Sequence, residues 1–154
     1  MRAPQAAATP ATHRLRLRVY YEDTDLAGIV YYANYLRFIE RGRSEWVRAL
    51  GIDQTALRRD HDIVFAVRRV EADYLIPARF DDEIEVTTRL ADLGGARIVL
   101  DQQVLRGAEV LFAARVTLAC LTSTGRPARL PGGVRAQLAG EGPNSARSRA
   151  VSLD

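Results

Sequence analysis

The spacing of apolar residues divides the first third of the chain into three predicted elements. Residues 15–21 alternate apolar and polar side chains with a period of two, which predicts a half-buried strand. Over residues 32–50 the apolar side chains recur every three or four positions, which predicts a helix of about 18 residues and ~27 Å. Gly51 supplies a stop signal, and a short second helix is expected over residues 53–60, with Asp53 as its N-cap.

The remainder of the chain reads as strands joined by tight turns. Residues 63–75 are apolar and β-branched, and a slip in their alternation at Arg68 and Arg69 predicts a bulge. Strands joined by hairpins form an antiparallel sheet, and a long helix can cover one face of it. The predicted fold is therefore α+β, a long central helix wrapped by a five-stranded antiparallel sheet, whose free edges favour a homodimer joined edge to edge. The last three strands are expected over residues 83–92, 97–106 and 110–120.

Length and composition describe one ordinary domain. The 154 residues are 47% hydrophobic and 27% charged, enough to bury a real core. We expect the folded domain over residues 14–138, with disordered tails at 1–13 and 139–154, whose sequences lack periodicity. No apolar run approaches the ~20 residues that span a bilayer, and the start of the chain lacks the apolar block of a secretory signal. The expected location is therefore the cytoplasm.

Charge and the scarcity of cysteine and histidine exclude several classes of function. The net charge is +3 and all 22 basic residues are arginine, scattered rather than gathered into a stripe with aromatic residues. That pattern argues against nucleic acid as a partner and fits attraction to an anionic small molecule. Cys120, the only cysteine, reads as a small buried hydrophobe. With only His13 and His61 besides, the common zinc ligand sets cannot be assembled, so no metal is expected.

The densest chemistry lies between the first strand and the long helix, in the stretch DTDLAGIV that begins at Asp23. Carboxylates near a helix start gain ~0.3–1 kcal/mol from the helix dipole, but Asp25 lies well before the expected first turn. Free N–H groups at a helix start can also hold the carbonyl oxygen of an ester or thioester as it becomes an oxyanion. Asp25 would then attack the carbonyl carbon or activate a water that does. Gly28 would let the backbone approach closely.

The sequences RVYYEDTD at 18–25 and GIVYYANY at 28–35 resemble the signature of the hotdog-fold acyl-CoA thioesterases of the 4-hydroxybenzoyl-CoA thioesterase family. The most similar branch is the bacterial one associated with the Tol-Pal cell-envelope system. ERGR at 40–43 and YLIPARFDD at 74–82 continue the resemblance, which covers about residues 14–135. It implies the hotdog fold, hydrolysis of acyl-CoA to free acid and coenzyme A, and no metal or redox cofactor. It also implies homodimers, often paired into homotetramers, with active sites at subunit boundaries.

The resemblance assigns roles to individual residues. The catalytic aspartate of the family matches Asp25, and its oxyanion donor, a backbone N–H at the helix start, matches Tyr32. Gly28 and Val30 are expected to contact substrate. The Tol-Pal branch commonly has histidine where this chain has Tyr32, so a backbone donor survives the change but an imidazole role does not.

Four arginines are candidates for the phosphates of coenzyme A, because guanidinium groups suit phosphate well. They are Arg68, Arg69, Arg79 and Arg97. The arginine pair that the 4-hydroxybenzoyl branch uses falls on Gly94 and Gly95 here, so that way of holding the phosphates cannot be copied onto this chain.

Other carboxylates compete with Asp25. Glu40 lies roughly 12 Å along the helix from Tyr32, and we expect it to pair with Arg41 or Arg43. Asp23 is expected to order the loop.

Other functions stay open at this point. One alternative is a non-catalytic protein that uses the same pocket to dock acyl carrier protein or envelope proteins. For either function, peripheral contact of the cytoplasmic protein with the inner membrane stays open. A dehydratase would need a histidine–acid pair, for which no suitable histidine is present.

Overall fold

A computed structural model of the protein describes residues 11–140, so most of both expected tails lies outside the described residues. His13, expected within the N-terminal tail, is the first residue of a strand. The elements in chain order are β1 (His13–Arg18), a 3-10 turn (Tyr21–Asp23), α1 (Asn34–Ala49), α2 (Gln54–His61), β2 (Val64–Tyr74), β3 (Glu83–Leu93), β4 (Arg97–Arg106), β5 (Glu109–Leu121) and α3 (Gly132–Leu138).

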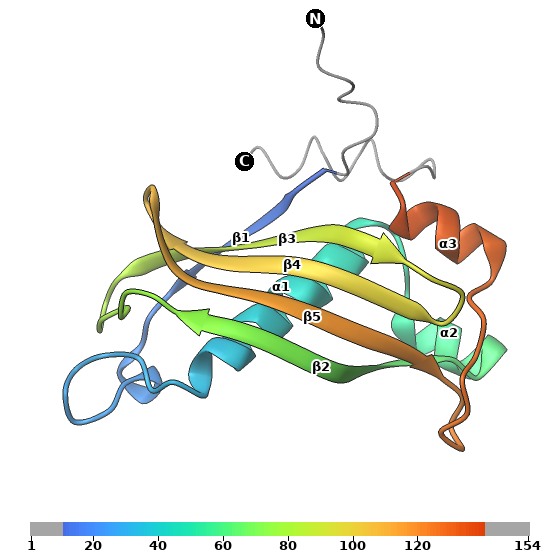
Figure 1. The fold of residues 1–154 in the computed structure, drawn as a ribbon, viewed down its shortest axis with the longest axis horizontal. Coiled ribbons are helices and arrows are strands. Elements are labelled where there is room, and N and C mark those ends of the chain that lie inside the picture. The colour runs from blue at the N-terminus through green and yellow to red at the C-terminus, as the bar shows by residue number, and fades with distance from the viewer. Residues whose placement is uncertain (1–10, 141–154) are drawn as a thin grey trace, which may run out of the picture.

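The five strands form one antiparallel sheet in the order β1-β3-β4-β5-β2. α1 lies across one face of this sheet, where it packs against β1, β3 and β4 (Figure 1). α2 and α3 lie at one end of the molecule, and the loop between β1 and α1 lies at the other (Figure 1). The predicted α+β architecture, a long helix on a five-stranded antiparallel sheet, is confirmed.

The core forms where the apolar stripe of α1 meets the sheet. Gly42 allows the closest approach, because a Cβ built there would lie 2.5 Å from Cγ1 of Val86 on β3. Beside it the buried amide of Gln102 donates to Ile39 O and to Thr88 Oγ1, both at 2.9 Å. Helix and sheet are therefore held in one register by close packing and by hydrogen bonds. The stripe on α1 comprises Tyr35, Phe38, Ile39, Gly42, Trp46 and Val47.

Two predicted boundaries around the acidic loop are wrong, and Asp23 is the cause of both. The first strand ends at Arg18 rather than at residue 21, because the Asp23 carboxylate accepts a hydrogen bond from the Tyr20 N–H at 2.8 Å and closes a turn. The helix begins at Asn34 rather than at Tyr32, because the Tyr31 N–H bonds to Asp23 O at 2.9 Å and holds the preceding residues in a second turn.

Other local predictions are confirmed. Asp53 caps α2 by accepting a hydrogen bond from the Ala56 N–H at 3.0 Å. The register of β2 against β5 shifts between Val67 and Arg69, which is the expected bulge.

The strands β1 and β2 are the two edges of the sheet. β2 is exposed from Val67 to its end, so an unpaired row of backbone groups runs along one side of the described domain. None of the helices within residues 11–140 is long and apolar enough to cross a bilayer.

Candidate active site

The loop that carries Asp25 is a tight hairpin. Thr24 and Val30 form an antiparallel bridge, and the Asp25 N–H bonds to Ile29 O at 3.0 Å. Gly28 closes the tip with a φ of +75°, a conformation that favours glycine. The Asp25 carboxylate is exposed, and within residues 11–140 its one hydrogen bond is the one that Oδ1 accepts from the Ala27 N–H at 2.9 Å. The side chain is thus held at the loop while Oδ2 is left available.

Asp23 joins this loop to the start of α1. Its side chain is 4% exposed, and Oδ1 accepts from Asn34 Nδ2 at 2.6 Å while Oδ2 accepts from the Tyr20 N–H at 2.8 Å. Its backbone oxygen accepts from the Tyr31 N–H. With both carboxylate oxygens occupied, Asp23 orders the loop, as expected from the sequence, and Asp25 is the acid that remains free to react.

The start of α1 carries backbone N–H groups that have no partner among the described residues. Ala33 is the N-cap and supplies no side-chain cap. The N–H groups of Tyr32 and Ala33 make no hydrogen bond to any acceptor within residues 11–140. Such groups at a helix start favour negative charge, so this segment suits a developing oxyanion. The Tyr32 side chain is 63% exposed beside them.

The hairpin rests on the turn that follows β2. The Val30 N–H donates to Ala78 O at 2.8 Å, and Ile29 bridges Arg79. The Val30 side chain is only 3% exposed and lies in the core. Val30 therefore lies beneath the loop in the described chain. Gly28, by contrast, is half-buried at the turn of the loop.

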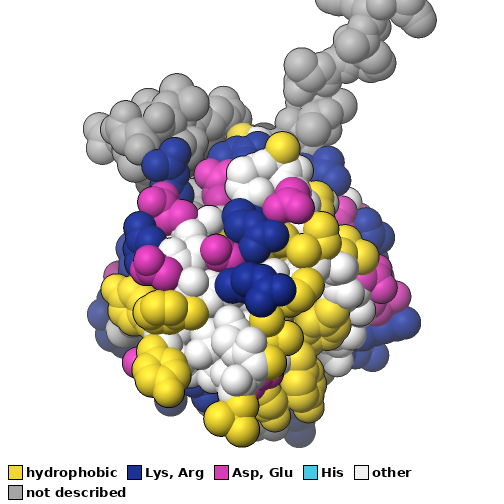
Figure 2. Space-filling view, turned by 90° about the vertical axis from the view of Figure 1, so that its left-hand side faces the viewer, with side chains coloured by type: hydrophobic (Ala, Val, Ile, Leu, Met, Phe, Trp, Pro, Cys, Tyr) yellow, Lys and Arg dark blue, Asp and Glu magenta, His cyan; other side chains and the backbone are white. Residues whose placement is uncertain are grey.

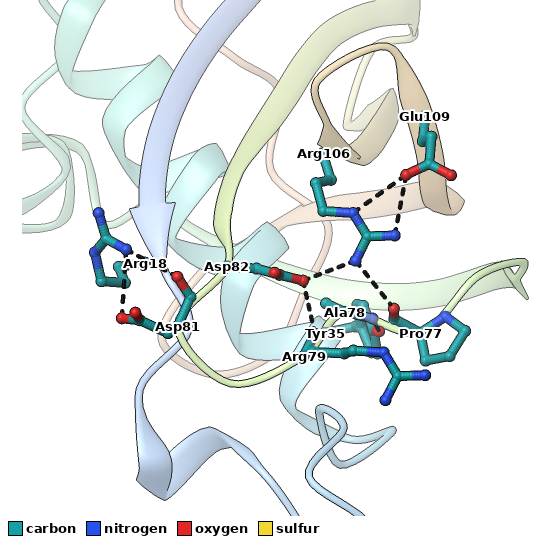
Figure 3. A network of polar contacts seen from close by, with 9 residues as sticks. All are labelled: Arg18, Tyr35, Pro77, Ala78, Arg79, Asp81, Asp82, Arg106 and Glu109. Carbon is teal, nitrogen blue, oxygen red and sulfur yellow. Dashed lines mark hydrogen bonds and ion pairs between the residues drawn. The ribbon is translucent and has the colours of Figure 1, made fainter.

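That supporting turn is held by a polar network (Figure 3). Asp82 Oδ2 accepts from the Arg79 N–H and from Arg106 Nη1, both at 2.8 Å. Arg106 also donates to Glu109, and these two carboxylates raise the pKa of the Arg106 guanidinium. The Ala78 N–H donates to the hydroxyl oxygen of Tyr35 at 2.9 Å, which joins the turn to α1.

Aromatic and apolar side chains surround the loop. Seen from the end of the molecule that carries it, hydrophobic side chains gather in the lower part of the surface, while Arg, Asp and Glu side chains are mixed above them (Figure 2). The site therefore offers apolar surface next to an exposed carboxylate. The exposed apolar residues of this region are Tyr20, Tyr21, Leu26, Tyr31, Tyr32 and Phe80.

Among the four predicted arginines, Arg79 lies beside this loop, where it bridges Ile29, and the other three lie elsewhere in the same chain. Arg68 precedes Tyr74 by six residues of β2, about 20 Å at about 3.3 Å per residue. Arg97 begins β4 at the end of the sheet opposite the loop (Figure 1). Arg68 and Arg97 share a cleft of about 420 Å³, with alanine side chains in its lining, while Arg69 pairs with Glu71 at 3.5 Å. One chain carries Asp25, Gly28 and Tyr32 on one loop with Arg79 beside it, and places Arg68, Arg69 and Arg97 elsewhere.

Competing reactive groups are occupied, buried or far from the loop. Glu40 accepts from the Ser44 hydroxyl at 2.8 Å, and Arg43 donates to Gln102 rather than to Glu40. His61 is exposed at the end of α2. Cys120 is fully buried, as expected, and burial raises the pKa of its thiol to about 11. Among residues 11–140 no three His, Cys, Asp or Glu side chains gather into a possible metal site.

One contact at the site was not expected from the sequence. The Tyr74 hydroxyl, at the end of β2, donates to Tyr32 O at 3.1 Å. These residues are 42 positions apart, and no short-range pattern pairs them.

Comparison with known proteins identifies relatives. The family model described as "Thioesterase-like superfamily" matches residues 19–138. "Acyl-CoA thioesterase YbgC" of Haemophilus influenzae is 40% identical over 105 residues, 68% of this chain and 77% of that protein. "Acyl-CoA thioester hydrolase YbgC" of Escherichia coli O157:H7 is 38% identical over 109 residues, 70% of this chain and 81% of that protein.

Solved structures agree with these relatives. A probable thioesterase from Bartonella henselae has a TM-score of 0.75 at 40% identity, over 79% of this chain and all (100%) of that chain. A hypothetical protein from Aquifex aeolicus has a TM-score of 0.75 at 26% identity, over 81% of this chain and 98% of that chain. The expected hotdog fold is confirmed.

Proposed function

Because this chain belongs to the thioesterase-like superfamily, we propose that it hydrolyses acyl-CoA thioesters at the site formed by Asp25 and the start of α1. The observation that carries the proposal is an exposed carboxylate on the same short loop as a helix start whose Tyr32 and Ala33 N–H groups have no acceptor in the described part of the chain. The substrate class is supported by relatives from Haemophilus influenzae and Escherichia coli that are named as acyl-CoA thioesterases.

The chemistry follows from these two features. The Tyr32 N–H donates to the thioester carbonyl oxygen and stabilises the negative charge that develops there. In one route Asp25 takes a proton from water as the water oxygen attacks the carbonyl carbon; the C–S bond then breaks and the thiolate regains a proton. In the other route Asp25 itself attacks the carbonyl carbon, the C–S bond breaks, and the coenzyme A thiolate leaves and takes up a proton. Water then hydrolyses the mixed anhydride to the acid and the free Asp25 carboxylate. A single turnover in ¹⁸O-labelled water tests the choice, because label in the Asp25 carboxylate rules out the simple general-base route.

Release of coenzyme A is the direct test of the proposed function. The purified full-length chain is offered short-chain, long-chain and aromatic acyl-CoAs, and free thiol is measured. We expect thiol from at least one class of substrate. Absence of thiol from the whole panel would favour the alternative of a non-catalytic protein that docks acyl carrier protein in the same pocket, an alternative that Tyr32 in place of histidine supports.

A homodimer would bring Arg68 and Arg97 of one copy near the Asp25 loop of the other. The exposed edge of β2 can pair with the β2 of a second copy, so that the two sheets continue into one. In such a two-fold antiparallel pair, the start of one β2 lies beside the end of the other. The cleft of Arg68 and Arg97 would then lie near the partner's loop and could receive the phosphates of coenzyme A. Pairing of dimers into tetramers, association with the Tol-Pal system and peripheral contact with the membrane stay predictions.

The arginine cleft leads to a prediction. Arg68→Ala and Arg97→Ala should each raise KM for acyl-CoA about tenfold, equivalent to about 1.4 kcal/mol, because each removes a charge-assisted hydrogen bond to phosphate. KM for the same acyl group on N-acetylcysteamine, which lacks the nucleotide, should not change. Arg16→Ala on β1, the opposite edge of the sheet, is the matched control. Equal losses with both substrates would remove these arginines from phosphate binding.

A further inference from the structure

Tyr74 links the edge strand to the start of the helix. It is the last residue of β2 and pairs with Phe112 of β5. Its ring packs edge-on against Phe112 and Tyr35, with centroids 5.0 and 5.5 Å away, and against Tyr32 at 6.2 Å. These contacts leave the hydroxyl directed at a single acceptor within the described chain, Tyr32 O, at 3.1 Å.

The acceptor itself has no other partner in the described chain. Of the three carbonyls that lead into α1, Tyr31 O accepts from the Asn34 N–H at 2.8 Å and Ala33 O accepts from the Leu36 N–H at 3.2 Å. Between them, Tyr32 O receives no backbone N–H from residues 11–140. The Tyr74 hydroxyl is therefore what fixes the peptide between Tyr32 and Ala33.

That peptide and the one before it carry the two free N–H groups. A trans peptide directs its N–H opposite to its C=O. The bond to Tyr31 O thus directs the Tyr32 N–H away from the turn, and the bond to Tyr32 O directs the Ala33 N–H away from Tyr74. Together the two bonds fix the backbone on both sides of the Tyr32 Cα.

We propose that Tyr74 is a positioning residue, whose hydroxyl holds the Tyr32 carbonyl and thereby aims the N–H groups of Tyr32 and Ala33 at the thioester oxygen. This inference rests on the proposed thioesterase activity. Tyr74 touches no reacting atom and acts only through the backbone that it orients. Burial raises the pKa of Tyr74, so its hydroxyl keeps the donated proton throughout the neutral range.

Tyr74→Phe tests this role, because it removes the hydroxyl and keeps the ring contacts. We expect kcat to fall about tenfold, while KM for acyl-CoA stays within about twofold, since the N–H groups act mainly on the charge that develops in the transition state. Affinity for a trifluoromethyl-ketone analogue of acyl-CoA, whose adduct presents an oxyanion, should fall by the same factor. Thr55→Val, which removes an exposed hydroxyl from α2 at the opposite end of the molecule (Figure 1), should match the wild type in all three.

The outcomes separate this inference from the proposed function. An active wild type with a Tyr74→Phe variant of equal kcat and equal analogue affinity overturns the role of Tyr74 and leaves the thioesterase proposal standing. A change in the pKa values of the pH–rate profile in Tyr74→Phe would make Tyr74 a direct acid or base, and would also overturn the positioning role. A wild type that releases no thiol from any acyl-CoA overturns both.

Discussion

Asp25→Asn should lower kcat/KM for acyl-CoA by about 10²–10⁴-fold, the usual contribution of a general base. The amide oxygen of asparagine can still accept the Ala27 N–H that Asp25 Oδ1 accepts now, so the loop should keep its course. What the variant lacks is a basic or nucleophilic oxygen at position 25. The measurement is thiol release under steady state, with thermal unfolding recorded in parallel to confirm that the fold is retained.

The matched control for Asp25→Asn is Glu22→Gln. Glu22 is an exposed acid just before the same loop, and its loss removes equal charge without removing the proposed catalytic group. We expect it to retain wild-type kcat/KM within about twofold. If Asp25→Asn keeps full activity, the reacting carboxylate has been misassigned; if both variants lose activity equally, the effect is one of charge and not of chemistry.

Asp23→Ala should lower both stability and activity, for a different reason. It deletes two hydrogen bonds and leaves the buried amide of Asn34 and the Tyr20 N–H without partners. The buried Asn34 amide left unpaired costs about 1–3 kcal/mol, and loss of the part-buried bond to the Tyr20 N–H costs about 0.5–1.5 kcal/mol, so the free energy of unfolding should fall by about 3 kcal/mol. For a chain of this size that lowers Tm by roughly 6–12 °C, and the released loop should reduce kcat/KM at least about tenfold.

Asp23→Asn should give an intermediate loss of stability. Asparagine keeps one accepting oxygen, so it can satisfy either the Asn34 amide or the Tyr20 N–H but not both. We expect its Tm, from calorimetry or from circular dichroism, to lie between those of the wild type and Asp23→Ala. A Tm unchanged in Asp23→Ala would show that the two bonds do not hold the loop to α1 in solution.

Much of the fold follows from local patterns. The strand over Arg97–Arg106 coincides with the prediction, and the β2 bulge and the Asp53 cap are also confirmed. In each case the side-chain period or a capping side chain acts within a few residues, so the sequence records it directly. The sequence analysis predicts no helix where α3 lies. Gly132 and Gly133 disfavour a helix locally, and packing of Leu138 into the core overrides that preference.

The candidate site divides in the same way. One short loop contains Asp25, Gly28 and Tyr32, so a single sequence motif predicts all three as site residues. The Tyr74 hydroxyl reaches Tyr32 across 42 positions, a separation at which only the sheet and helix packing decide what meets. The arginines could be named by their chemistry, but their distance from the loop in one chain depends on the course of β2 and on whether a second copy pairs with it.

The burial of Cys120 within β5 has a practical result for the experiments above. Aromatic disulfide reagents react with thiolates, and this side chain is both inaccessible and protonated well above neutral pH. The folded protein is therefore expected not to react with such a reagent, and the colour that develops in an assay of free coenzyme A comes from the product alone. A signal that grows in a sample without substrate would come from the Cys120 thiol of unfolded chains. The same reagent therefore measures turnover in the sample with substrate and unfolding in the sample without it.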